Sequence, residues 1–196
     1  MSIQPHASET AASLANDAGE GWIDTIPPAA ATGSLAAAYE RQQAKLGRVT
    51  ELTQIGSLYP DLVEARLNLY AVVDATPSNV PDWARRAVAL LTSVLNGCRF
   101  CTVGHVEGLT AAGHEELAEE LKAHPDTASA QDPAVDALLE YTRKLVRRPG
   151  EITIKDVKAL RDAGWDDLAI LDVNNLAAYY SYINRVASGL GLTREA

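Results

Sequence analysis

The chain is short of aromatic, sulfur-containing and basic residues. Its 196 residues include two cysteines, one methionine and one phenylalanine, and aromatic residues amount to 6%. Few aromatics together with conspicuous alanine favour closely packed helices over a sheet. No apolar run approaches the length of a membrane span, and residues 1–20 lack the basic start and apolar core of a signal peptide. We therefore predict a cytoplasmic protein without a membrane partner.

Positive charge is also scarce. The chain has 17 Lys and Arg against 26 Asp and Glu, which gives a formal net charge of −9. A surface of this sign repels nucleic acid and anionic lipid, so we do not expect nucleic-acid binding. Hydrophobic residues make up 47% of the chain and charged residues 22%, which is the profile of an ordinary globular protein. The length suits one domain or one subunit of an assembly.

Helical signals recur along the chain, and no segment shows the alternation of a half-buried strand. Pro60 stands at a first-turn position, Asp132 precedes Pro133, and Asp166 precedes the last apolar-periodic stretch. We predict an all-α fold of about seven or eight helices, with residues 21–196 as a single domain and residues 1–20 as a mobile N-terminal arm.

Both cysteines lie in residues 96–105, which read Asn-Gly-Cys-Arg-Phe-Cys-Thr-Val-Gly-His. If a helix opens at Cys98, then Cys101 and His105 lie on the same face, with neighbours about 5–6 Å apart between Cβ atoms. A disulfide closes from this range with little movement. The positive end of the helix dipole favours thiolates at the first turn. The segment therefore predicts a reversible dithiol with a histidine beside it.

The spacing favours Cys101 as the attacking thiolate, because His105 is one turn away and can take its proton. Cys98 is then the resolving thiol, although the helix dipole alone favours Cys98 as the attacker. Two other interpretations stay open. A zinc site usually needs a second pair of ligands, which is lacking, but Cys98, Cys101 and His105 can form a three-ligand site. The two cysteines can also be inert core residues. Haem attachment is excluded, because it needs His where Thr102 stands.

The segment from Ser93 to His105 resembles the core of the AhpD-like alkylhydroperoxidase and carboxymuconolactone decarboxylase superfamily, with its Cys-x-x-Cys-x-x-x-His pattern. Residues 179–191 are similar to the C-terminal signature of the peroxidase-related branch, and residues 22–39 and 145–164 also look similar. The likeness covers most of the chain beyond the first twenty residues.

This resemblance implies an all-helical fold, a homo-oligomer such as a trimer or hexamer, and reduction of hydroperoxides with no metal or organic cofactor. It implies Cys101 as the peroxidatic thiol, Cys98 as the resolving thiol and His105 as the proton relay, with a thioredoxin-like or lipoyl dithiol as reductant. Two positions depart from the family. Its relay glutamate, twelve residues before the first cysteine, is Arg86 here, and a second histidine between the cysteines is Phe100.

Two functions of different classes therefore compete. The first is an antioxidant thiol peroxidase that uses Cys98, Cys101 and His105. The second is a non-enzymatic oligomer that senses oxidants or binds metal through the same residues. The sequence leaves open the peroxide, the reductant and the effect of Arg86.

Overall fold

The computed structural model describes residues 21–194, and in that range every regular element is a helix. The prediction of an N-terminal arm at residues 1–20 lies outside the described residues. The elements in chain order are η1 (Pro28–Ala30), α1 (Gly33–Leu46), α2 (Glu51–Gln54), α3 (Pro60–Asp74), α4 (Asp82–Leu95), α5 (Arg99–Ala111), α6 (Glu115–Ala123), α7 (Pro133–Arg147), η2 (Pro149–Glu151), α8 (Ile154–Asp162) and α9 (Asp167–Gly189).

The all-α prediction is confirmed. Residues 21–194 contain nine α-helices, one more than the maximum of eight that the sequence predicted. The additional helix is α2, whose four residues are too few to show a helical period. Between residues 21 and 194 we find no helix that combines the length and the apolar character needed to cross a bilayer.

Two predicted helix starts are confirmed by their capping bonds. The Asp132 carboxylate accepts the N–H groups of Ala134 and Val135 at the start of α7. The Asp166 carboxylate accepts the Ala169 N–H at the start of α9. Satisfying these otherwise unpaired donors fixes where each helix begins.

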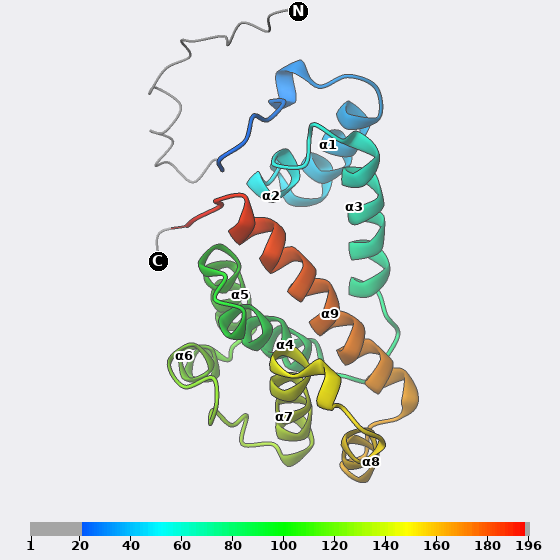
Figure 1. Cartoon of the computed structure of the whole chain (residues 1–196), viewed down its shortest axis with the longest axis vertical. Helices are drawn as coiled ribbons and strands as arrows, with labels where there is room; N and C mark the ends of the chain where they lie inside the picture. Colours follow the sequence, from blue (N-terminus) through cyan, green and yellow to red (C-terminus); the bar gives the residue numbers. More distant parts are fainter. Residues whose placement is uncertain (1–20, 195–196) are drawn as a thin grey trace, which may run out of the picture.

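Helix α4 lies at the centre of the fold and packs against α5, α6, α7 and α9 (Figure 1). Eight residues of α4 are buried, and the last seven of them are consecutive. They are small or aliphatic, with two hydroxyl side chains near the end of the helix: Ala84, Ala87, Val88, Ala89, Leu90, Leu91, Thr92 and Ser93. Helices α1 and α3 pack on one another at the top of Figure 1, and α3 also contacts α9. The large core thus surrounds α4, while a smaller one lies between α1 and α3.

Buried polar bonds join α4 to α9 at two levels. Near the helix starts, Arg85 forms an ion pair with Asp172 at 3.1 Å, and the Asp172 side chain is fully buried. Near the end of α4, the Asn184 amide donates to Ser93 Oγ at 3.0 Å. The order of the two contacts is the same along both helices, so α4 and α9 run parallel. Charged and amide groups buried in this way specify one register because any slip leaves them unpaired.

A tight turn joins α4 to α5 and ends with the first cysteine. Gly97 has φ +69°, its N–H donates to the Val94 carbonyl, and the Cys98 N–H donates to the Ser93 carbonyl, both at 3.0 Å. These two bonds form a Schellman motif, which closes α4 and requires a left-handed residue at the Gly97 position. Cys98 is therefore placed by the end of one helix and serves as the N-cap of the next.

We expect Gly97→Ala to lower the free energy of unfolding by about 1–2 kcal/mol, which is the cost of a Cβ in the left-handed region. No atom lies within 4 Å of the position of that Cβ, so strain is the only term. Gly189→Ala is the control, because its Cβ also meets open space and its φ is not positive. Denaturant unfolding measures both variants. Equal stability of the two would contradict the role of the turn.

Candidate functional site

The predicted dithiol is present with its two sulfurs in contact. Cys98 is fully buried and Cys101 is 7% exposed, and both are free thiols. Their Sγ atoms lie 2.7 Å apart, and the Cys101 N–H also donates to Cys98 Sγ at 3.4 Å. The pair is thus within easy reach of a disulfide, and only Cys101 has access to the space outside the core.

The two thiols share their protons unequally. The hydrogen bond from the Cys101 thiol stabilises the Cys98 thiolate, and together with the Cys101 N–H it lowers the pKa of Cys98 to about 6 against the opposing effect of burial. The same bond, followed by burial and the adjacent negative charge, raises the pKa of Cys101. At neutral pH the pair therefore shares one proton and carries one negative charge, which the hydrogen bond favours on Cys98.

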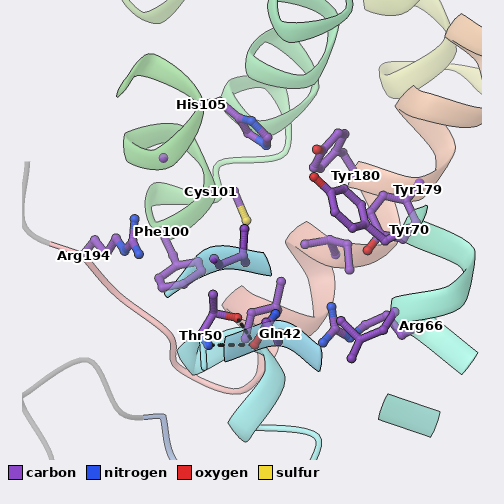
Figure 2. Close-up of a pocket in the computed structure, with 15 residues that line it drawn as sticks. Gln42, Thr50, Arg66, Tyr70, Phe100, Cys101, His105, Tyr179, Tyr180 and Arg194 are labelled. Atoms are coloured by element: carbon purple, nitrogen blue, oxygen red, sulfur yellow. Dashed lines mark hydrogen bonds between the residues drawn. The ribbon is translucent and has the colours of Figure 1, made fainter. Parts of the chain in front are cut away.

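Cys101 lies in the wall of a cavity of about 260 Å³ between α1, α3, α5 and α9. The cavity is mostly apolar and aromatic, with a few polar side chains, and it is lined by Gln42, Leu46, Thr50, Leu52, Arg66, Leu67, Tyr70, Phe100, Cys101, Gly104, His105, Tyr179, Tyr180, Ile183 and Arg194. Figure 2 shows Cys101 between His105 on one side and the Gln42 and Thr50 pair on the other. A mostly apolar cavity beside a dithiol suits an organic substrate.

His105 lines the same cavity one helical turn beyond Cys101, as the sequence predicts. Its ring meets the Tyr180 ring edge-on, with the centroids 4.5 Å apart. Burial, and next the positive charge of Arg86, lower the pKa of His105 to about 4. The imidazole is therefore neutral near pH 7, and a neutral imidazole can both accept and release a proton.

Arg86, where the resemblance expects a glutamate, lies beside the site. Its guanidinium pairs with Asp82 at 3.3 Å, and it is close to Gly108, since a Cβ there would lie 3.2 Å from it. Burial raises the pKa of Tyr70, and the positive charge of Arg86 opposes that rise. An arginine cannot act as a base near neutral pH, so the site as described contains a cation where the family pattern has a proton acceptor.

Several cavity residues were missed by sequence reasoning. The sequence assigned no site role to Tyr179 or Tyr180, but both line the cavity. Burial raises the pKa of Tyr179 to about 12 and raises that of Tyr180 further, so both remain neutral phenols. Arg66 and Arg194 belong to no sequence motif. They reach the cavity through the packing of α3 and of the C-terminal segment, which local sequence patterns do not predict.

The metal interpretation gains no geometric support. Among residues 21–194 no group of three or more His, Cys, Asp or Glu side chains is arranged to hold a metal ion. Cys98, Cys101 and His105 are brought to one place, but as a dithiol and a cavity-lining histidine.

No protein-family model matches the chain, and no curated protein sequence matches it. Solved structures do. An uncharacterized peroxidase-related protein from Silicibacter sp. TM1040 has 24% identity and a TM-score of 0.75, over 89% of this chain and 88% of that chain. The alkylhydroperoxidase AhpD core of an uncharacterized peroxidase-related protein from Ralstonia eutropha JMP134 has 21% identity and a TM-score of 0.80, over 88% and 91%.

A third similar structure is a Cys-to-Ala variant of the debrominase Bmp8 in complex with 2,3,4-tribromopyrrole, with 17% identity and a TM-score of 0.70 over 90% of this chain and 94% of that chain. The TM-scores of these three structures show that they share a fold with this chain. The chain therefore has the helical fold of the AhpD-like peroxidase-related proteins, as the resemblance of its Cys-x-x-Cys-x-x-x-His segment implied.

Proposed function

We propose that this protein is a thiol peroxidase that reduces organic hydroperoxides through Cys98, Cys101 and His105. The observation that carries the proposal is a dithiol with its sulfurs 2.7 Å apart, one of which opens onto an apolar cavity that also contains the histidine. The fold shared with peroxidase-related proteins supports it. A reversible dithiol of this kind suits the reducing cytoplasm.

The reaction begins at Cys101 because Cys98 has no access to the cavity. The shared proton moves across the sulfur contact from Cys101 to Cys98, and the Cys101 thiolate attacks the outer peroxide oxygen. The O–O bond breaks and its electron pair goes to the alkoxide. Neutral His105 relays the Cys98 proton to that alkoxide, directly or through a water, so that it leaves as an alcohol. Cys101 becomes a sulfenic acid.

Cys98 completes the cycle as the resolving thiol. Its low pKa keeps it a thiolate, which attacks the Cys101 sulfur, forms the disulfide and expels hydroxide that is released as water. The sum is one hydroperoxide and two thiols converted into one alcohol, one water and one disulfide. A dithiol reductant of the thioredoxin-like or lipoyl class then restores both thiols and leaves as its own disulfide.

We expect Cys101→Ser to abolish peroxide consumption, because the remaining thiol is shielded from the cavity. Cys98→Ser should instead form one sulfenic acid per chain without turnover, since nothing resolves it. Trapping of sulfenic acid with a dimedone probe, read by mass spectrometry, measures both. A sulfenic acid at Cys98 in the Cys101→Ser protein would assign the attack to Cys98 and reverse the two roles.

The shared proton predicts a pH dependence. The pKa of Cys98 is about 6 instead of the ordinary 9.0, so one thiolate per chain is present above pH 6 and is lost as pH falls through that value. Because the bond from Cys101 is the main cause, Cys101→Ala should raise the Cys98 pKa toward 9.0. Titration of the ultraviolet thiolate absorbance checks this. Equal titration curves in the two proteins would refute the shared proton.

The competing non-enzymatic role as an oxidant sensor or metal-binding protein makes a different prediction about turnover. A sensor forms the disulfide once, whereas an enzyme consumes many equivalents of hydroperoxide when a dithiol donor is added. Steady-state turnover of cumene hydroperoxide, together with metal analysis of the purified protein, separates the two.

A second candidate reaction is reductive dehalogenation of an aromatic halide by the same dithiol. The aromatic side chains around Cys101 and the shared fold with the debrominase Bmp8 favour it. In that reaction one aromatic halide and two thiols give the dehalogenated ring, hydrogen halide and a disulfide. Release of bromide from 2,3,4-tribromopyrrole in the presence of a dithiol distinguishes it from peroxide reduction.

The protein is also proposed to act as a homo-oligomer. Leu69 and Val72 of α3 are 51% and 71% exposed, and they line one surface hollow with Leu171 of α9, which is 55% exposed. Contiguous exposed apolar residues of this kind are typical of subunit interfaces. The interface would lie on the two helices that also carry Arg66, Tyr179 and Tyr180 to the cavity.

Light scattering should give a mass well above the 20.9 kDa of one chain. We expect Val72→Glu combined with Leu171→Glu to lower that mass, because burying two carboxylates in an apolar interface is costly. Ile154→Glu is the matched control, since Ile154 is 73% exposed but lies on α8. A stable monomer of the unaltered protein would remove the oligomer from the proposal.

A further inference from the structure

Arg66 is a buried cation that forms no ion pair with any carboxylate of residues 21–194. The residue is 9% exposed, and its Nη2 donates to Thr53 Oγ1 at 2.8 Å. The ion pairs found among residues 21–194 include Arg41 and Arg194, which also lie around α1 and the cavity, but none includes Arg66. Its neighbours Thr53 and Tyr179 offer neutral hydroxyl groups and no counter-charge.

A charge in this situation is unusual for a folded protein. Taking a guanidinium out of water costs several kcal/mol, and buried cations are normally paired with a carboxylate. An unpaired buried arginine is therefore a preorganised acceptor for an anion from outside the fold. The planar guanidinium binds a carboxylate through two parallel hydrogen bonds, which gives both strength and orientation.

The guanidinium points into the cavity beside Cys101. Figure 2 shows Arg66 and Gln42 at the side of the cavity away from His105, with Cys101 between the two sides. The Gln42 carbonyl accepts the Thr50 N–H at 2.9 Å, which leaves its amide group as a further donor. No aspartate or glutamate lines this cavity, although the chain as a whole has a net charge of −9. The cavity is thus cationic within an acidic protein.

The remaining walls define the body of the ligand. The cavity is otherwise lined largely by aliphatic and aromatic side chains, which include Leu46, Leu52, Leu67, Tyr70 and Ile183. A volume of about 260 Å³ is at the low end for ligand sites, so it favours a compact molecule over a long chain.

We propose that this cavity binds a compact organic hydroperoxide that carries a carboxylate, with the carboxylate on Arg66 and the hydroperoxide at Cys101. The proposal rests on the proposed peroxidase function and adds the class of its substrate. Arg66 acts as a binding residue that orients the substrate, and it takes no part in proton transfer.

Binding of 4-isopropylbenzoate tests the site without any peroxide chemistry. Calorimetry compares this acid with 4-isopropylbenzamide, its neutral isostere, on the unaltered protein. We expect the acid to bind at least about tenfold more tightly, because a hydrogen bond to a charged group contributes that much. Equal affinity for the acid and the amide would overturn the proposal even if no variant could be prepared.

Arg66→Met should weaken binding of the acid at least about tenfold and leave binding of the amide unchanged. Arg66→Lys should fall between, because a lysine keeps the charge and loses the bidentate geometry. The matched control is Arg194→Met. Arg194 also lines the cavity, but Glu51 and Glu107 lie within 4 Å of it and already balance its charge. A larger loss in Arg194→Met than in Arg66→Met would overturn the assignment to Arg66.

Thermal unfolding supplies a structural readout. Removing an unpaired buried charge relieves its desolvation, so Arg66→Met without ligand should be at least as stable as the unaltered protein. The acid should then raise the melting temperature of the unaltered protein and not that of the variant. A marked loss of stability in Arg66→Met would mean that Arg66 has a structural role and would count against the anion site.

Kinetics separate the two proposals from one another. The ratio of kcat/KM between the 4-carboxylate derivative of cumene hydroperoxide and cumene hydroperoxide itself should exceed about ten and should fall toward one in Arg66→Met. If both hydroperoxides are reduced equally, the carboxylate-binding role is overturned and the peroxidase stands. If the acid binds but neither hydroperoxide is reduced, the peroxidase is overturned while the anion site is supported.

Discussion

The turn between α4 and α5 is the constraint on which the site depends. Its two backbone bonds close α4 and at the same time set the position of Cys98 at the first turn of α5. The Asn96 side chain donates to the Asn184 amide oxygen at 3.0 Å, and Asn184 donates in turn to Ser93. Helix α9 is therefore held against the same turn, which brings Tyr179 and Tyr180 to the cavity that Cys101 faces. One local structure thus positions the dithiol and the opposite wall.

The cavity combines an apolar lining with unbalanced positive charge. The proton shared by the two thiols concentrates the negative charge of the pair on Cys98, behind Cys101 and away from the cavity. Among residues 21–194, Arg66 has no carboxylate partner, whereas Arg194 pairs with Glu51 and Glu107 and the nearby Arg86 pairs with Asp82. His105 in the same wall is neutral. An entering anion therefore meets no ionised acid in the walls, and the low dielectric of the interior strengthens each attraction. The acidic character of the whole chain does not extend to this place.

Local signals in the sequence predicted much of the fold. Asp132 and Asp166 cap helices because a short carboxylate at the N-cap satisfies free N–H groups, and this chemistry depends only on neighbouring residues. The spacing of Cys98 and Cys101 similarly predicted their contact, because residues three apart in a helix are neighbours on one face. Helix α2 was missed because four residues contain no full period.

The cavity was beyond the reach of such signals. Arg66 lies 35 positions before Cys101 in the chain, and nothing in its neighbourhood on α3 distinguishes it from a surface arginine. It becomes exceptional only when α9 and the α2 region cover it, because burial without a partner is a property of the assembled helices. The tyrosines of α9 likewise read as packing residues, and their contribution to the site depends on the parallel pairing of α4 with α9.

The substitution of Arg86 for the family glutamate can now be interpreted physically. A carboxylate base is needed where a thiol must be deprotonated against an ordinary pKa. In this site the Cys101 thiol already supplies a hydrogen bond that ionises Cys98, so the resolving thiolate exists before peroxide arrives. Burial and the cation at position 86 keep His105 neutral, so it can relay to the alkoxide the proton that Cys98 accepts from Cys101. A glutamate there would favour the imidazolium instead, which could not accept a proton. In this chain the pair of thiols and a neutral histidine together replace the separate base.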